Sequence, residues 1–127
     1  MMKPTLLFVD DCEVMCRFLV QYFNSHYGTL AFQSVGDAWR WLDEGNFPDL
    51  IILDLRMPDV SGFEMLAQLK YSALFLDIPV IILSSIDSSA ERVRCLQAGA
   101  ADYLIKPFNP KELEHKIQFH IRLSNAP

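Results

Sequence analysis

The chain has 127 residues, of which 51% are hydrophobic and 21% charged, and its formal net charge is -5. This length fits one domain, and the composition is that of a globular protein rather than a disordered one. There is no lysine- or arginine-rich run that could neutralise a line of phosphates, so we do not expect direct nucleic-acid binding. The apolar runs are far shorter than the roughly 20 residues that cross a bilayer, and neither a signal peptide nor a membrane contact is expected.

Five short runs predict strands, in chain order Thr5–Val9, Leu30–Ser34, Leu50–Leu53, Val80–Leu83 and Asp102–Ile105. Segments with the helical spacing of apolar residues follow each run. Continuous apolar runs are typical of parallel strands that helices cover on both faces. The alternation therefore predicts an α/β protein of five β/α units around a parallel sheet, in a single domain over residues 1–127.

Helix boundary signals agree with this order. Two serines each precede a glutamate by three residues, a glycine follows the fourth helical segment, and a proline begins the fifth, which gives Ser61 with Glu64, Ser88 with Glu91, Gly99 and Pro110. These are the patterns of capping boxes, of a helix terminator and of a first-turn proline.

Several residues that could carry chemistry are interpreted as structural. The cysteines form an odd set without paired metal-ligand spacing, and reduced thiols in a cytoplasmic protein account for Cys12, Cys16 and Cys95. Trp39 and Trp41 fall on different sides of the second helix, so one is expected in the core and the other at the surface. The histidines are scattered without the spacing of metal ligands on one helical face, and they are His26, His115 and His120.

Polar residues end four of the predicted strands. They are Asp10 and Asp11, Asp54, Ser84 and Ser85, and Lys106 followed by Pro107. In open parallel sheets, ligands bind beyond the carboxyl ends of the strands, so these side chains are expected to lie together. Three carboxylates would repel one another without a partner, and a hard cation such as Mg²⁺ would hold them ionised. The sequence therefore predicts a metal site.

The same strand ends predict phosphoryl chemistry. A lysine supplies a positive charge and a serine a hydroxyl, and together they suit an oxyanion such as a phosphoryl group. A carboxylate beside them can attack phosphorus and form an acyl phosphate. Taken singly, each residue has an ordinary structural interpretation: turn or cap for the aspartates, and a solvated charge for Lys106. Their coincidence at four strand ends favours the site.

Four stretches resemble the receiver domain of bacterial response regulators, and the likeness runs from Thr5 to about Leu123. They are FVDDCE at Phe8–Glu13, LIILDLRMPDVSGFE at Leu50–Glu64, PVIILSS at Pro79–Ser85 and GAADYLIKPF at Gly99–Phe108. The second, an aspartate followed by Met57-Pro58 and Gly62, is the most specific. The resemblance implies a flavodoxin-like, doubly wound (βα)5 fold with a five-stranded parallel sheet in the order 2-1-3-4-5.

The resemblance also implies a role for each site residue. Asp54 would be the phosphoacceptor, and Mg²⁺ would be held by Asp10, Asp11, Asp54 and the backbone carbonyl of Arg56. Ser84 and Lys106 would contact phosphoryl oxygens and assist the reaction. Ser84 and Tyr103 would form the switch, Tyr103 turning inward when Ser84 is drawn to the phosphoryl group. Pro107 would follow a cis peptide bond.

By the same resemblance the chain is a signalling switch rather than an enzyme, although it would promote its own phosphorylation and slowly hydrolyse its acyl phosphate. Its phosphodonor would be a sensor histidine kinase or a histidine phosphotransfer protein. The fourth helix, fifth strand and fifth helix would form the surface that controls an output domain or a partner protein, and this surface could also form a homodimer.

Several positions depart from the commonest family pattern. Ser85 stands where a smaller residue is frequent, and Arg56 and Ile86 occupy variable positions that flank the site. Gln97 and Ala101 replace acidic residues that are usual in receivers attached to winged-helix DNA-binding domains, which lowers the expectation of such a domain. The ending IQFHIRL is more similar to receivers that continue into a helical linker.

Three other functions compete with this interpretation. A flavodoxin-like redox protein would need a Ser/Thr/Gly-rich phosphate loop where Asp10-Asp11-Cys12 stands. A metal-dependent phosphohydrolase would want an acidic residue two positions after the nucleophile, and here that residue is Arg56. An adaptor with this fold could also bind its partners without phosphorylation.

Overall fold

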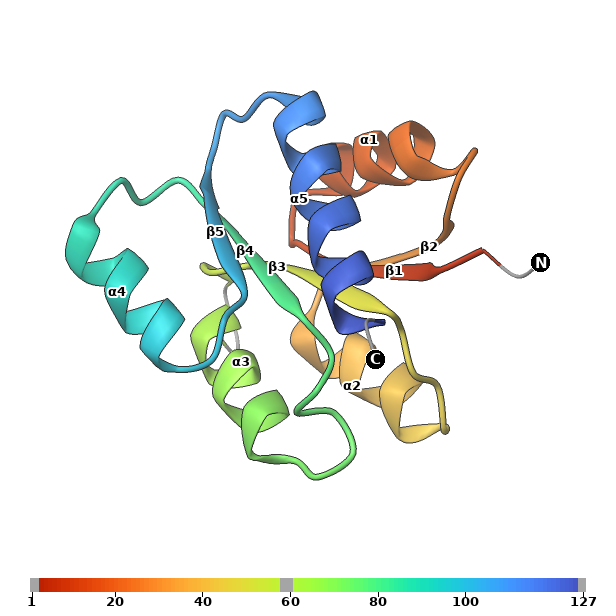
Figure 1. Ribbon diagram of the computed structural model, residues 1–127, viewed down its shortest axis with the longest axis horizontal. Helices are drawn as coiled ribbons and strands as arrows, with labels where there is room; N and C mark the ends of the chain where they lie inside the picture. The colour runs from red at the N-terminus through yellow and green to blue at the C-terminus, as the bar shows by residue number, and fades with distance from the viewer. Residues whose placement is uncertain (1–2, 58–60, 126–127) are drawn as a thin grey trace.

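The computed structural model describes residues 3–57 and 61–125, with a five-stranded parallel sheet at its centre (Figure 1). The strands are β1 (Thr5–Val9), β2 (Gly28–Phe32), β3 (Leu50–Asp54), β4 (Val80–Ser84) and β5 (Asp102–Ile105). The helices are α1 (Glu13–Phe23), α2 (Val35–Asp43), α3 (Gly62–Tyr71), α4 (Ser89–Gln97) and α5 (Pro110–Ser124). The strands lie in the order β2-β1-β3-β4-β5, which confirms the predicted order 2-1-3-4-5.

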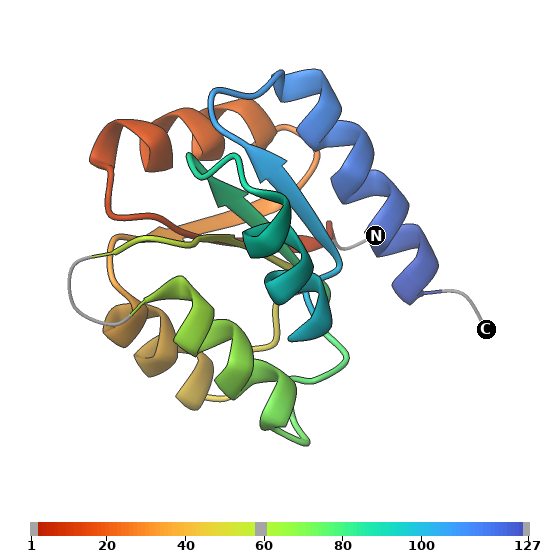
Figure 2. The ribbon, with the colours of Figure 1, turned by 90° about the vertical axis from the view of Figure 1, so that its left-hand side faces the viewer.

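Helices cover both faces of the sheet. Figure 2 shows α1 and α5 on one side and α2 and α3 on the other. Two apolar clusters fill the spaces between these layers: one packs side chains of α1 and α5 on the sheet, and the other packs those of α2 and α3, with Cys95 from α4. Because β1, β3 and β4 are buried on both faces, their residues form the continuous apolar runs seen in the sequence.

The second strand differs from its prediction. The sequence placed it at Leu30–Ser34, whereas β2 begins at Gly28, opposite Thr5 of β1, and ends at Phe32. The predicted bounds were wrong because Ser34 has another role. Its hydroxyl accepts a hydrogen bond from the backbone N–H of Asp37 at 3.1 Å and caps α2.

The predicted helix boundaries are confirmed. The hydroxyls of Ser61 and Ser88 accept from the N–H groups of Glu64 and Glu91, at 3.2 and 3.3 Å respectively. Gly99 ends α4 with φ at +109°, a left-handed conformation that favours glycine, and Pro110 begins α5. Local capping chemistry therefore sets these boundaries.

Both tryptophans are half-buried, so the prediction of one core and one exposed indole was wrong. Trp39 packs edge-on against Phe75 and Trp41 packs against Phe32, because both large rings cover the same apolar cluster. Cys16 and Cys95 are buried and Cys12 is exposed, all as free thiols. Among the described residues, no helix is both long and apolar enough to span a membrane.

Candidate functional site

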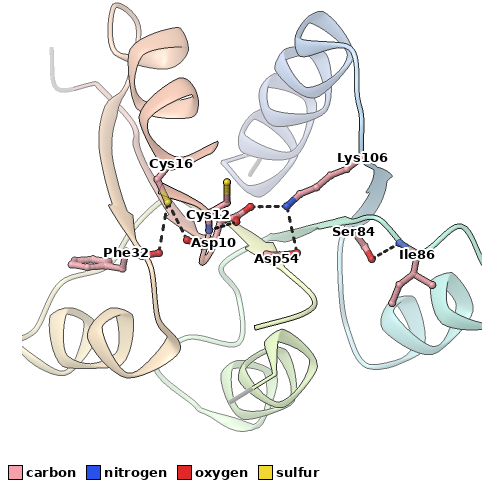
Figure 3. Close-up of polar contacts among 8 residues, drawn as sticks. All are labelled: Asp10, Cys12, Cys16, Phe32, Asp54, Ser84, Ile86 and Lys106. Atoms are coloured by element: carbon pink, nitrogen blue, oxygen red, sulfur yellow. Dashed lines mark hydrogen bonds and ion pairs between the residues drawn. The ribbon is translucent and has the colours of Figure 1, made fainter. Parts of the chain in front are cut away.

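The register of the sheet brings the polar strand ends to one edge, which we call the carboxyl edge. Asp54 lies opposite Leu83 in the neighbouring strand, and Ser84 lies opposite Ile105, directly before Lys106. Because parallel strands end on the same side of a sheet, Asp10, Asp54, Ser84 and Lys106 come from four different strand ends to one place (Figure 3). The predicted convergence of these residues is therefore confirmed.

Three carboxylates and one ammonium form the centre of the site. Asp10, Asp11 and Asp54 each place one carboxylate oxygen within 4.8 Å of the others. The Lys106 ammonium donates to Asp10 Oδ2 at 2.7 Å and lies 3.5 Å from Asp54 Oδ1. A cluster of hard oxygen ligands of this kind fits a divalent cation such as Mg²⁺.

Asp10 is held from several directions. Its Oδ1 accepts from the backbone N–H of Cys12 at 2.9 Å, and its carbonyl oxygen lies 3.1 Å from the Cys16 thiol, which donates to it. In the first contact the aspartate side chain accepts from the backbone N–H two residues further along the chain, which forms a turn that is common for aspartates. The contact from Cys16 was not predicted, because only the packing of α1 on the sheet brings that thiol to the end of β1.

The surroundings of Asp54 disfavour its charge. Burial and the neighbouring Asp10 carboxylate raise the pKa of Asp54 to about 6, although the Lys106 ammonium and the N–H of Arg56 act in the opposite direction. Burial alone would lower the pKa of Lys106, but its contacts with Asp10 and Asp54 outweigh burial and raise that pKa. The edge therefore holds excess negative charge that a cation would relieve.

Ser84 and Tyr103 are linked through the backbone of Ile86. The Ile86 N–H donates to Ser84 Oγ at 3.0 Å, and the Tyr103 hydroxyl donates to the Ile86 carbonyl at 2.8 Å. Tyr103 is only 5% exposed, so its ring points inward. The segment between β4 and α4 thus connects the serine at the site to the predicted switch tyrosine.

The first turn of α3 packs directly behind Asp54. A Cβ atom on Gly62 would lie 1.9 Å from the Asp54 carbonyl oxygen, and the Gly62 N–H donates to the Leu55 carbonyl at 3.0 Å. Glycine is required here because backbone meets backbone. The sequence marked Gly62 only by resemblance, and the steric reason for it is a tertiary contact.

The remaining predicted residues lie around this centre. Asp11, Arg56 and Ser85 are exposed, and the peptide bond between Lys106 and Pro107 is cis, as expected. The metal-binding role of the Arg56 carbonyl stays a prediction. Pro58, which belongs to the family-like stretch after Asp54, lies outside the described residues.

Comparison with known proteins gives a consistent picture. The family model of the response regulator receiver domain matches residues 6–118. The chain is 43% identical over 125 residues to the phosphate regulon transcriptional regulatory protein PhoB of Escherichia coli (strain K12), covering 95% of this chain and 53% of PhoB. It is 34% identical over 124 residues to the probable transcriptional regulator ycf27 of Guillardia theta, covering 97% of this chain and 47% of that protein.

Solved structures agree with these relatives. The receiver domain of the Francisella response regulator 1452 superposes with a TM-score of 0.87 at 29% identity, covering 97% of this chain and all of that chain (100%). The chain spans about half the length of the curated relatives it matches. Its fold, its sequence and the residues at its carboxyl edge place this chain in the response regulator receiver domain family, to which it belongs.

Proposed function

We propose that this chain is a phosphorylation-dependent signalling switch that accepts a phosphoryl group on Asp54 with the help of Mg²⁺. The convergence of three carboxylates and Lys106 at the carboxyl edge is the observation that carries the proposal. Asp10, Asp11, Asp54 and the backbone carbonyl of Arg56 would hold the cation. When bound, Mg²⁺ neutralises charge on the carboxylates and on the phosphoryl oxygens.

The reaction is a transfer between two covalent bonds. One Asp54 oxygen attacks phosphorus while the phosphorus–nitrogen bond to the donor imidazole breaks, and the imidazole leaves with the bonding electrons. Lys106 already lies within reach of Asp54 and would pair with a phosphoryl oxygen. The Ser84 hydroxyl, whose oxygen accepts from the Ile86 N–H, keeps its own proton to donate to another. The chain would also hydrolyse its acyl phosphate slowly.

Readout would follow from the contact between Ser84 and the phosphoryl group. Moving Ser84 moves Ile86, whose carbonyl accepts from Tyr103, so the β4–α4 segment and the switch tyrosine respond together. The surface of α4, β5 and α5 would then bind an output domain or a partner protein better in one arrangement than in the other. The same surface is a candidate for homodimerisation.

The family indicates the partners and the setting. The donor would be a sensor histidine kinase or a histidine phosphotransfer protein in the cytoplasm. The chain carries no lysine- or arginine-rich run, so we propose that residues 1–127 do not themselves bind DNA. We propose that these residues form one receiver domain.

Intact-mass measurement after incubation with acetyl phosphate and Mg²⁺ tests the proposal. The parent chain should gain the mass of one phosphoryl group, and hydroxylamine should remove it as expected for an acyl phosphate. Asp54→Asn should gain nothing, whereas Asp43→Asn, which changes an exposed aspartate in α2, should behave as the parent does. If the parent gains no mass and does not bind beryllofluoride with Mg²⁺, the switch is wrong and a phosphorylation-independent adaptor is favoured.

A further inference from the structure

The side chain of Arg94 joins two neighbouring helices. Its guanidinium carbon lies 3.6 Å from the centroid of the Phe63 ring in the first turn of α3. Its Nη1 donates to Glu91 Oε1 at 2.9 Å, in the first turn of α4. A planar guanidinium stacks well on an aromatic face, so this contact holds the beginnings of α3 and α4 together.

These two helical turns flank the predicted phosphorylation site. The turn of α3 is fixed against Asp54, because there is no room for a side chain at Gly62. The turn of α4 follows the segment that begins at Ser84. A small cavity of about 280 Å³ lies between them, and Phe63, Ile86 and Arg94 are among the residues that line it.

Ile86 connects this cavity to the switch. Ile86 is one of the residues that line the cavity, its N–H donates to Ser84 and its carbonyl accepts from the Tyr103 hydroxyl. A contact that fixes α4 against α3 therefore also fixes the backbone to which Tyr103 is bonded. Arg92, two residues before Arg94 in α4, lies with its guanidinium carbon 5.7 Å from the centroid of the Tyr103 ring.

Helix α2 offers an internal comparison. It too has a serine cap at Ser34, an acidic residue three positions on at Asp37, and an arginine, Arg40, whose Nη1 lies 3.3 Å from Asp37 Oδ1. The side chains of that pair are 77% and 53% exposed, against 53% and 21% for Arg94 and Glu91. The arginine and acid pair is thus a local helix feature, and the stack on Phe63 is what distinguishes Arg94.

We infer that Arg94 is a positioning residue: its stack on Phe63 holds the β4–α4 segment, and with it Tyr103, in the inward arrangement before any phosphoryl group is bound. The inference rests on the proposed switch and names a residue that sets its resting position. If most molecules already have Tyr103 in the inward arrangement, the site binds a phosphoryl group more tightly, because fewer molecules must change arrangement on binding.

Fluorine NMR of protein labelled with 3-fluorotyrosine tests this inference, with Tyr103→Phe used to assign the Tyr103 signal. The water exposure of that signal is measured first without added ions, in the parent and in Arg94→Ala, Arg94→Lys, Phe63→Leu and the double variant Arg94→Ala with Phe63→Leu. Arg40→Ala is the matched control. Beryllofluoride is then titrated in the presence of Mg²⁺.

We expect Arg94→Ala and Phe63→Leu each to expose the Tyr103 signal and to weaken beryllofluoride binding about two- to five-fold, the range for a half-exposed cation–π contact. The double variant should bind beryllofluoride no more weakly than either single variant, because the two substitutions remove the same contact. Arg94→Lys should keep part of the parent's protection of Tyr103 and part of its affinity for beryllofluoride. Arg40→Ala should match the parent in both measurements.

The outcomes separate this inference from the proposed function. A Tyr103 signal in Arg94→Ala that is as protected as in the parent overturns the role of Arg94, whether or not beryllofluoride binds. Additive effects in the double variant also overturn it. A parent that binds no beryllofluoride overturns the proposed function instead, while the measurement without added ions still decides the position of Tyr103.

Discussion

Two adjacent residues of β3 show how the interior of the sheet differs from its carboxyl edge. Leu53 is fully buried among apolar side chains, and such burial stabilises the fold. Asp54, the next residue, is 8% exposed and has its pKa raised to about 6, so its ionised form opposes folding. Leu53 therefore stabilises the fold and has no reactive group, whereas Asp54 has a reactive carboxylate and lowers stability.

The same contrast holds across the sheet. Within residues 3–57 and 61–125, the buried polar side chains are Asp10, Asp54 and Ser84, and all three lie at the carboxyl edge. Strand interiors on either side of them are apolar. Stability and function are therefore separated along each strand, so substitutions a single position apart should have opposite effects.

Leu53→Ala should have the largest effect on stability. Removing a buried leucine side chain from a sheet interior costs about 2–5 kcal/mol of the free energy of unfolding. Urea denaturation measures this loss, and Leu74→Ala is the control because Leu74 is 69% exposed. Phosphorylation by acetyl phosphate should continue in the folded fraction. If phosphorylation stopped in the folded fraction as well, stability and function would not be separated between the strand interior and the carboxyl edge.

Gly62→Ala should have the next largest effect, because it forces a methyl group onto the backbone of Asp54. We expect a loss of about 2–3 kcal/mol from the free energy of unfolding and slower phosphorylation of the displaced site. Gly36→Ala in α2 is the matched control: apart from the adjoining backbone of its own helix, no heavy atom of the described residues lies within 4 Å of its new Cβ. This substitution should stabilise the helix by about 0.5–1 kcal/mol. Equal effects of the two substitutions would contradict the steric interpretation.

Asp54→Asn should stabilise the protein while abolishing phosphorylation. The raised pKa means that the stability associated with protonated Asp54 is lost as pH rises through about 6. Asparagine has no charge to bury, so the free energy of unfolding at pH 8 without divalent cations should rise by about 1–3 kcal/mol. Denaturation at pH 4 and pH 8 checks this, since the gain should shrink at low pH. A gain that is equal at both pH values would exclude the burial of charge as its cause.

Asp102→Asn should have the smallest effect, and that effect should disappear in acid. Burial alone would raise the pKa of Asp102, but hydrogen bonds from His120, Lys116 and the Tyr103 N–H outweigh it and hold the pKa below its usual value. This stabilisation is present above about pH 4, the ordinary aspartate pKa, and is lost as pH falls through the lower folded-state value. The variant should lose on the order of 1 kcal/mol at pH 6 and little below pH 3. An equal loss at both pH values would contradict the linkage.

Much of the fold could be predicted from local patterns. The apolar runs identified β1, β3, β4 and β5 to within one residue, and serine caps identified the starts of α3 and α4. The bounds of β2 were wrong because its residues are only half-buried, which leaves a weak apolar pattern, and because Ser34 resembled a strand residue while it caps a helix. The predicted capping boxes include Glu91, but nothing in the sequence marked the stack of the nearby Arg94 on Phe63.

Local patterns in the sequence specify which residues end the strands, and therefore which chemistry could gather at one edge, because strand burial and capping are read from neighbouring residues. How those residues are used depends on contacts made in the folded protein. The bond from Lys106 to Asp10, the close approach of Gly62 to Asp54 and the stack of Arg94 on Phe63 each join segments that are distant in the chain or lie on different elements. Such contacts depend on the register of strands and the packing of helices, which no local pattern specifies.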